Sequence, residues 1–182
     1  VSTGQFAGYP CVSFALPCGD SVQVALQGAQ VLSWVSGGRE RLYLSPAAAQ
    51  DGHSAIRGGV PVCFPQFNER GSLPKHGFFR NQAWRQASVD GIPANAEVLI
   101  QQSAAGVEQG TLCLALSDDA ASRSVWPHPF AARLVVHLAR GVLRVTLAVR
   151  NTGDQPLAFS GALHTYLAVD DIGQTRLGGL GG

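Results

Sequence analysis

The residues best suited to binding or chemistry gather in one stretch of the chain, residues 55–84. This stretch contains three arginines, one histidine, five aromatic residues and two adjacent glycines. It is too polar for a protein core, and it holds too many aromatic side chains for an ordinary surface loop. Its composition therefore predicts a binding site for a small ligand.

Arg57 and Arg80 are the candidate partners for an anionic group on that ligand. The planar guanidinium fork binds a phosphate or a carboxylate through two parallel hydrogen bonds. Arg57 is followed by two glycines, which would let the backbone approach a ligand closely. Ion pairs on the protein surface, with Asp51 or Glu69, are the alternative role for these arginines.

Two histidines are candidates for proton transfer. His76 lies in the stretch itself, and His164 lies in a strand-like segment on the same face as Ser160 and Ala162. These small neighbours would leave room above the sheet, where an imidazole can donate or accept a proton near neutral pH. A purely structural role is the alternative for both histidines.

The aromatic residues of the stretch belong either to the core or to a sugar-binding surface. The apolar face of a sugar ring can stack on one or two aromatic rings, while its hydroxyls need polar partners such as Gln66. The sequence contains no GxSxG motif or similar setting for an activated serine or cysteine. It gives no support for a nucleophilic triad.

Short strands must position these residues. Runs of alternating or β-branched apolar residues, most of them separated by glycine, proline, serine or aspartate, predict an antiparallel, all-β protein. The expected strands are 11–16, 21–26, 30–35, 41–44, 60–64, 96–103, 111–116, 130–139, 142–151 and 156–169. One short helical turn is expected at 45–50, with Ser45 as its cap.

Two turns in the second half of the chain predict a three-stranded meander. Residues 139–141 should join strand 130–139 to strand 142–151, and residues 151–154 should turn the chain back into 156–169. Within 142–151, the apolar residues alternate with Arg144, Thr146 and Arg150. One face of that strand should therefore lie against the core.

Length and composition point to a single domain covering residues 1–182. The chain has 182 residues, 46% of them hydrophobic, and a formal net charge of +1. Because no long basic or acidic run stands behind that charge, neither nucleic acid nor a membrane surface is the expected partner. No apolar run is long enough to span a membrane, and no secretory signal is recognisable, so we expect a cytoplasmic protein.

The four cysteines show no spacing typical of a metal or redox site. Cys11, Cys18, Cys63 and Cys113 are widely separated, and no CxxC pair occurs. We expect core or surface thiols and no metal. A disulfide between Cys11 and Cys18 is the main alternative.

Three motifs resemble the aldose 1-epimerase superfamily, specifically its glucose-6-phosphate 1-epimerase (hexose-6-phosphate mutarotase) branch. They are IRGGVPVCFPQF at 56–67, LPKHGFFRNQAW at 73–84 and NTGDQPLAFSGALHTYLAVDDI at 151–172. The resemblance extends from about Phe14 to Gly182. It implies a galactose-mutarotase-like antiparallel β-sandwich, or supersandwich, that binds the sugar in an open cleft on one sheet.

The resemblance also implies an activity and the residues that carry it. Such enzymes interconvert the α and β anomers of a sugar by acid and base chemistry, without a metal or other cofactor. By resemblance, His164 is the general acid on the ring oxygen and His76 positions the sugar. Arg57 and Arg80 would hold the 6-phosphate of glucose 6-phosphate. Asp171 matches a motif aspartate whose role the sequence leaves unassigned.

The sequence departs from the family at its C-terminal end. The family's chain continues beyond LGGLGG at 177–182, and its general-base carboxylate comes from that later part. We therefore expect a fold that is incomplete at the C-terminus and a chain that is poorly active and prone to associate, as a monomer or weak homo-oligomer. A non-catalytic module that binds sugar or sugar phosphate, and a purely structural sandwich, are the alternatives.

Overall fold

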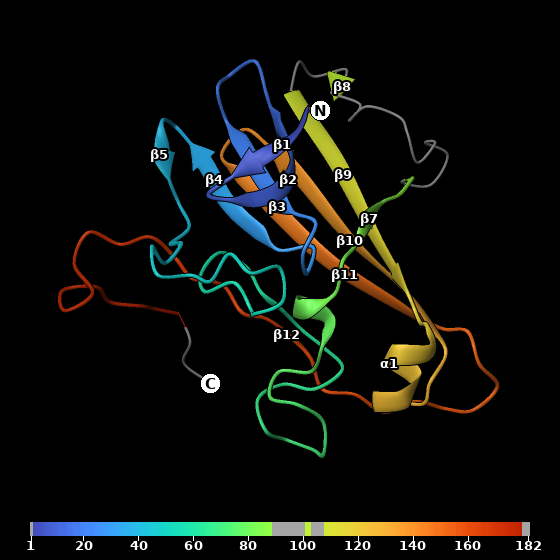
Figure 1. Cartoon of the computed structure of the whole chain (residues 1–182). Coiled ribbons are helices and arrows are strands. Elements are labelled where there is room, and N and C mark those ends of the chain that lie inside the picture. The colour runs from blue at the N-terminus through green and yellow to red at the C-terminus, as the bar shows by residue number, and fades with distance from the viewer. Residues whose placement is uncertain (1, 89–100, 103–107, 180–182) are drawn as a thin grey trace.

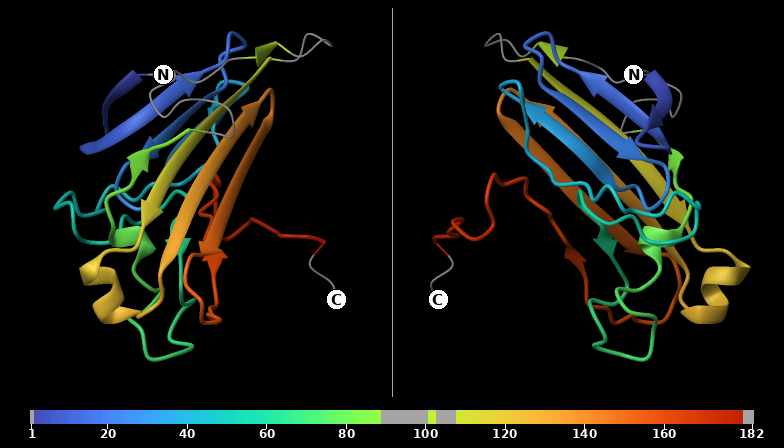
Figure 2. Two further views of the ribbon diagram at one scale, coloured as in Figure 1. Left: turned by 90° about the vertical axis from the view of Figure 1, so that its right-hand side faces the viewer. Right: turned by 60° about the vertical axis from the view of Figure 1, so that its left-hand side comes forward.

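Two antiparallel sheets face each other as the layers of a β-sandwich (Figures 1 and 2). The structure is a computed structural model, and it describes residues 2–88, 101–102 and 108–179. A short two-stranded sheet lies beside the sandwich. The all-β prediction is confirmed, with one short helix among the described residues.

The first sheet is formed by the N-terminal part of the chain. Its strands follow one another in space as in sequence: β1 (Ser2–Phe6), β2 (Tyr9–Ala15), β3 (Ser21–Ala25), β4 (Val31–Ser36) and β5 (Arg39–Glu40). Tight turns with glycines at positive φ, such as Gly8 (φ 83°), join neighbouring strands. β1 was absent from the expected strands, because STGQF shows no apolar alternation.

The second sheet follows the order β11-β10-β9-β7, with β8 also paired to β9. Its strands are β7 (Arg85–Gln86), β8 (Gln101–Gln102), β9 (Glu108–Ser117), β10 (Phe130–Ala139) and β11 (Val142–Asn151). Ala139 pairs with Val142, so Arg140 and Gly141 form a two-residue turn within the predicted connection 139–141, with φ of 72° at Gly141. The expected alternation in β11 is confirmed by its burial pattern.

The hydrophobic core fills the space between the two sheets. Val12, Phe14 and Val24 enter it from the first sheet, and Leu114 and Leu134 enter it from the second. The inward residues of β11 are only half-buried. β10 is the only strand paired with β11 among the described residues, so the other edge of β11 makes no strand pairing there.

A buried carboxylate links the ends of the two layers. Asp20 is 3% exposed, and it accepts hydrogen bonds from the Gly141 amide (2.7 Å), the Ser36 hydroxyl (3.0 Å) and the Gly37 amide (3.1 Å). The Gly141 bond contributes most to holding the pKa of Asp20 below its ordinary value. Asp20 therefore fastens the β10–β11 turn to the end of β4.

The predicted third strand of the meander is wrong. Residues 156–169 do not pair with β11; within them, β12 (Ala162–Leu163) pairs with β6 (Val62–Cys63). Alternating residues favour an extended chain but do not specify its partner. Here the partner, β6, lies within the 55–84 stretch, and the chain extends away from the sandwich only after residue 168, whose amide still bonds to the Arg41 carbonyl (Figure 1).

Other expectations need smaller corrections. Residues 41–44 form only isolated bridges, through Leu42 and Leu44, and residues 45–50 form one turn in which the Ser45 hydroxyl accepts from the Ala47 amide (3.3 Å). Of the expected strand 96–103, only 101–102 lies within the described residues. A helix, α1 (Ala120–Val125), was not expected.

Three further observations bear on the sequence analysis. Cys11 and Cys18 are both free thiols, so the alternative disulfide between them is not formed. Among the described residues, no group of three histidine, cysteine or carboxylate side chains is placed to hold a metal. No helix in the described part of the chain has the length and apolarity to cross a membrane.

Candidate functional site

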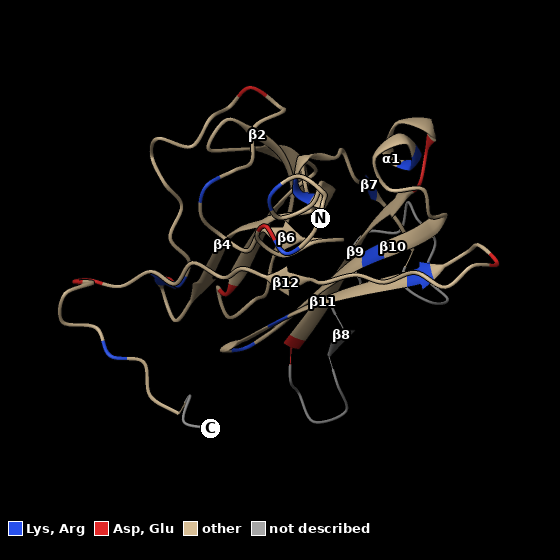
Figure 3. Cartoon of the chain, turned by 90° about the horizontal axis from the view of Figure 1, so that it is seen from below, with Lys and Arg blue, Asp and Glu red and all other residues tan. Residues whose placement is uncertain are grey.

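Backbone pairing with the 55–84 stretch sets the position of His164. Beyond the β12–β6 pair, the His164 amide donates to the Pro61 carbonyl (3.0 Å) and the Tyr166 amide donates to the Gly59 carbonyl (2.8 Å). The register therefore carries His164 to the segment that follows Arg57. Figure 3 shows β12 and β6 side by side, with basic segments of the chain beside β6.

Ser160 ties the same two segments together a second time. Its amide donates to the Pro65 carbonyl (3.0 Å), and its hydroxyl accepts from the Phe67 amide (2.9 Å). Both bonds join residues more than ninety positions apart in the sequence; Ser160 and Phe67, for example, are separated by 93 positions. Ser160 thereby fixes the start of the His76 loop against the strand that carries His164.

The two candidate histidines lie next to each other. Their ring centroids are 6.0 Å apart with nearly perpendicular planes. The Phe67 ring packs 5.3 Å from His76, and the Tyr166 ring packs 4.9 Å from His164. Within the described residues, the buried Nδ1 atom of His164 has no hydrogen-bond partner. The structure thus brings together two imidazoles that the sequence places far apart.

His76 is held as a neutral imidazole by its surroundings. Burial is the largest cause that lowers its pKa, followed by the positive charge of Arg80 and then by His164 and Lys75. Glu69 acts in the opposite direction. At neutral pH, His76 is therefore suited to hydrogen bonding rather than to carrying a positive charge.

A hollow of about 900 Å³ has His76 in its lining, whereas His164, whose ring packs against His76, is not among the lining residues. The side chains that can offer charge, an imidazole or an aromatic ring there are those of Tyr43, Arg57, Lys75, His76, Arg80 and Tyr166, beside the hydroxyls of Ser45 and Ser54. No aspartate or glutamate of the described chain is among the lining residues. The hollow therefore offers positive charge, hydrogen-bond donors and aromatic rings, which fit an anionic sugar.

Arg80 and Arg57 differ in how firmly they are held. Arg80 is half-buried, and one of its terminal nitrogens donates to the Lys75 carbonyl (2.8 Å). Its Nε atom is buried without a partner among the described residues. Arg57 is exposed, and no hydrogen bond or ion pair of its side chain is found within the described part of the chain. Arg80 is the better prepared of the two for a ligand.

The glycines after Arg57 serve the protein's own packing. An added Cβ would lie 2.4 Å from the Tyr43 carbonyl oxygen at Gly58, and 2.1 Å from the Val31 carbonyl oxygen at Gly59. Both glycines also have positive φ. The expectation that they make room for a ligand is corrected, because neighbouring backbone occupies that space.

Two other predicted residues are not part of the lining of the hollow. Gln66 is 3% exposed, and its amide is bonded to the backbone of Asn68 and Leu73. The Asp171 carboxylate accepts from the Gly173 amide (2.8 Å) and from the Gln174 side chain (2.7 Å) in an exposed turn. Both side chains are thus engaged locally in this structure.

Lys75, Tyr43 and Tyr166 line the hollow without having been predicted as site residues. Lys75 directly precedes His76 in the motif LPKHGFF, so its neighbourhood was a usable signal. Tyr43 comes from the segment that bridges to Leu167, and no feature of RLYL indicates that contact. The alternative role of Arg57 and Arg80, ion pairs with Asp51 or Glu69, is not found among the described residues, where Glu69 pairs with Lys75 at 3.9 Å.

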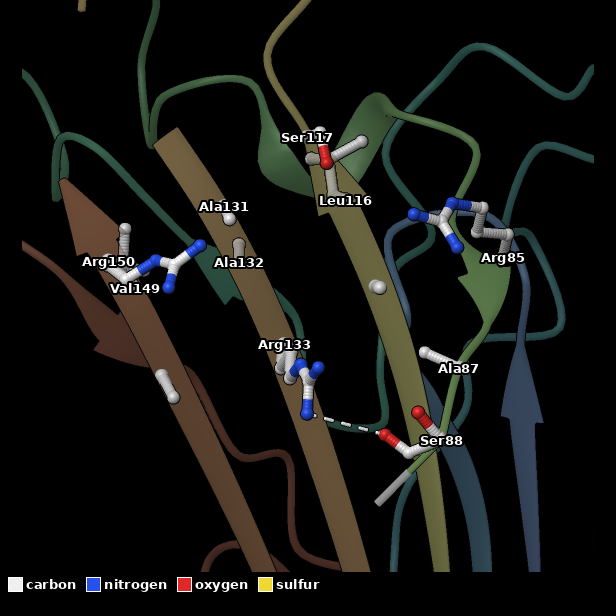
Figure 4. A pocket seen from close by; sticks show the side chains of 12 residues that line it. Arg85, Ala87, Ser88, Leu116, Ser117, Ala131, Ala132, Arg133, Val149 and Arg150 are labelled. Atoms are coloured by element: carbon white, nitrogen blue, oxygen red, sulfur yellow. Dashed lines mark hydrogen bonds between the residues drawn. The ribbon is translucent and has the colours of Figure 1, made fainter. Parts of the chain in front are cut away.

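A second hollow lies on the outer face of the second sheet (Figure 4). It measures about 470 Å³ and contains Arg85, Arg133 and Arg150 over a floor of small residues. Arg133 donates to the Ser88 carbonyl (3.4 Å). Neither a histidine nor a carboxylate lines this hollow among the described residues. Proton-transfer chemistry therefore favours the hollow beside His76 and His164.

Comparison with known proteins agrees with the geometry. The family model for aldose 1-epimerase matches residues 10–181. A protein from Cenchrus ciliaris is 37% identical over 166 residues, and one from Escherichia coli (strain K12) is 36% identical over 160 residues. Both are named "Putative glucose-6-phosphate 1-epimerase", and the matches cover 87% and 86% of this chain.

Solved structures show the same fold. A crystal structure of a "putative mutarotase" from Salmonella typhimurium matches 93% of this chain with a TM-score of 0.72 and 28% identity. The Slr1438 protein from Synechocystis matches 92% with a TM-score of 0.69 and 25% identity. The matched parts are 52% and 58% of those chains, and 46% and 48% of the two relatives above. This chain spans about half the length of the proteins it resembles.

Proposed function

Because the chain belongs to the aldose 1-epimerase family, we propose that its hollow binds a hexose 6-phosphate, glucose 6-phosphate first, and supports interconversion of its α and β anomers. One observation carries the proposal. The pairing of β12 with β6 sets His164 beside His76, and His76 lines a hollow together with Arg57 and Arg80. Proton donors and phosphate-binding cations are thereby combined in one place.

Each residue has a distinct part in the proposed reaction. Arg80 and Arg57, with Lys75 beside them, bind the 6-phosphate by charge-assisted hydrogen bonds. Neutral His76 donates a hydrogen bond to a sugar oxygen and so sets the ring's orientation. His164 gives a proton to the ring oxygen as the bond from that oxygen to C1 breaks.

The remaining steps complete the proton balance. A base removes the proton of the C1 hydroxyl, so that C1 becomes an aldehyde carbon in the open chain. Rotation about the C1–C2 bond presents the other face of that carbon. His164 then takes its proton back from the hydroxyl formed at the ring oxygen, the base returns its proton, and the ring closes as the other anomer. No net proton is gained or lost.

The described chain supplies the acid more clearly than the base. No aspartate or glutamate of the described residues lines the hollow. A positioned acid or base each contributes about 10²- to 10⁴-fold to a rate. Because no carboxylate base lines the hollow, we expect the 182-residue chain to exchange anomers about 10²- to 10⁴-fold more slowly than an enzyme that has both an acid and a base in place.

Magnetization exchange between the two anomers of glucose 6-phosphate, measured by NMR, tests the proposal. We expect the chain to accelerate exchange above the buffer rate and His164→Ala to abolish most of that acceleration. His128→Ala is the matched control, because the His128 ring packs on Trp126 near α1 and, among the described residues, has no ring contact with His76 or His164. Equal rates for His164→Ala and the unchanged chain would exclude His164 as the acid.

A non-catalytic sugar-phosphate-binding module is the second candidate. Positive side chains without a carboxylate in the lining favour binding over proton abstraction. Calorimetry with glucose 6-phosphate, run beside the exchange measurement, separates the two functions. Binding without any acceleration would assign the module, and acceleration would assign the enzyme.

A further inference from the structure

The loop that carries His76 is closed around a buried side-chain amide. The Nε2 atom of Gln66 donates to the carbonyls of Asn68 and Leu73, at 3.0 Å each, and its Oε1 atom accepts from the Leu73 amide at 3.1 Å. Three of the four hydrogen bonds that a glutamine amide can make are thus used within the loop. Gln66 therefore joins the beginning of the loop, at Asn68, to its far side, at Leu73.

Two reciprocal hydrogen bonds then connect the loop to the imidazole. The His76 amide donates to the Asn68 carbonyl (3.0 Å), and the Asn68 amide donates to Nδ1 of His76 (3.1 Å). The Asn68 carbonyl accepts from both Gln66 and His76. Gln66 and His76 are therefore linked through one peptide residue, with no substrate involved.

The backbone at both ends of this link is unusual. Asn68 has φ of 53° and His76 has φ of 66°. Residues other than glycine adopt this left-handed conformation in only a few per cent of cases, asparagine and histidine more often than most. Such a conformation persists where surrounding bonds hold it, and here those bonds come from Gln66 and the reciprocal pair.

The Asn68 bond decides where the His76 proton lies. A backbone amide can only donate, so Nδ1 must present its lone pair, and the single proton of the neutral ring lies on Nε2. Protonating Nδ1 would direct two donors at each other. The positive charges of Arg80 and Lys75, and the neighbouring His164, also disfavour a second proton, whereas Glu69 favours it.

We infer that Gln66 is a positioning residue, whose buried amide holds the 66–76 loop so that the Asn68 amide fixes His76 as a neutral hydrogen-bond donor through Nε2. Gln66 was expected to bind the sugar directly, and its assignment changes accordingly. The catalytic significance of this role rests on the proposed function, in which His76 orients the sugar and does not exchange a proton. The tautomer itself does not depend on that function.

His164 provides the contrast within the same site. Its Nδ1 atom is buried and has no partner among the described residues, so no backbone amide fixes its tautomer. One imidazole of the pair is held as a donor through Nε2, and the other has no hydrogen bond at Nδ1 that fixes its tautomer. The division of roles follows from the hydrogen bonds rather than from the residue types.

Imidazole ¹⁵N NMR of the unchanged chain tests the tautomer without any sugar. We expect a protonated signal for Nε2 and an unprotonated signal for Nδ1 of His76, identified by comparison with His76→Asn, and a through-bond coupling from Nδ1 to the Asn68 amide. Protonated Nδ1 in the neutral ring would overturn the inference. Because no activity is measured, failure here is distinct from failure of the proposed function.

Two variants test the part assigned to Gln66. Gln66→Glu keeps the size of the side chain but loses both donated bonds. Gly71→Ala keeps the amide but places a Cβ 2.6 Å from its Oε1 atom; Gly4→Ala, with nothing within 4 Å, is the matched control. We expect Gln66→Glu and Gly71→Ala to populate both tautomers of His76 and to raise the pH midpoint of the His76 titration. Gly4→Ala should leave both unchanged.

Gly71→Ala decides the question if Gln66→Glu fails to fold, because Gly71 is exposed and carries no positive φ. A folded Gly71→Ala chain with the amide displaced and the His76 tautomer and midpoint unchanged would overturn the positioning role of Gln66. A change in the tautomer populations or the midpoint of either variant, with Gly4→Ala unaffected, supports it.

Discussion

Replacing Arg80 by methionine should weaken the binding of glucose 6-phosphate much more than the binding of glucose. Arg80 is half-buried and anchored to the Lys75 carbonyl, so its guanidinium is already oriented before a ligand arrives. A hydrogen bond to a charged group contributes about 1.5–3 kcal/mol. At about 1.4 kcal/mol for each factor of ten, the loss is about 10- to 150-fold in Kd for the phosphate ester.

Arg57→Met should have a smaller effect than Arg80→Met. The Arg57 side chain is exposed, so solvent screens its charge. It must also lose up to about 2 kcal/mol of side-chain conformational freedom when it holds a ligand. We therefore expect less than about a tenfold increase in Kd for glucose 6-phosphate, by the conversion used above.

Calorimetry with glucose 6-phosphate and with glucose, at two salt concentrations, measures both effects. Arg150→Met is the matched control, since Arg150 belongs to the outer hollow of Figure 4. Added salt should reduce binding of the phosphate ester and not of glucose. Equal losses for both sugars, or the same loss with Arg150→Met, would refute phosphate recognition by Arg80.

Four further outcomes are expected. Gly77→Ala should lower the free energy of unfolding by about 2–4 kcal/mol in urea titrations, because its Cβ would lie 2.2 Å from the Phe64 carbonyl oxygen at a φ of 67°; an unchanged midpoint would contradict this. Ser160→Ala should remove about 1–3 kcal/mol by leaving the Phe67 amide unpaired, while Ser160→Thr, which keeps the hydroxyl, should lose less. Since the folded-state pKa of Asp20 is depressed, the stability that it contributes is present above its unfolded pKa of about 3.9 and is lost as pH falls through the folded pKa; Asp20→Asn should be less stable than the unchanged chain at pH 7 and converge with it in acid. Phe159 is 61% exposed, so Phe159→Ser should reduce any concentration-dependent association seen by sedimentation, and identical association would assign it to another surface.

The parts of the fold that depend on neighbouring residues were predictable. The β10–β11 hairpin follows from a two-residue turn and from side chains that alternate over ten residues on each side. The partner of β12 was not predictable, because β12 and β6 lie about one hundred residues apart in the sequence. Alternating apolar residues indicate a strand but do not indicate which strand it pairs with. α1 had a readable signal in the Asp119 and Ser122 capping box.

The residues of the candidate site also differ in how far the sequence could predict them. His76 and Arg80 stand four residues apart, so a single polar stretch indicated both, whereas only the register of β12 brings His164 to them. Gln66 illustrates why residue type was insufficient. Its amide was expected to face a sugar, but backbone groups of its own loop satisfy it, and a sequence does not show where those groups point.

The attachment of the His164 segment has a consequence for when the site exists. That segment joins the molecule by a two-residue ladder and by single bonds to residues 41–43 and 59–67, outside the two large sheets. Such attachments open with a smaller free energy than the core strands, as separate cooperative units. Amide hydrogen exchange should therefore be faster at His164 and Tyr166 than at Leu134 in β10. The acid would then leave and rejoin its partner histidine while the sandwich stays folded, and ligand binding would slow that exchange.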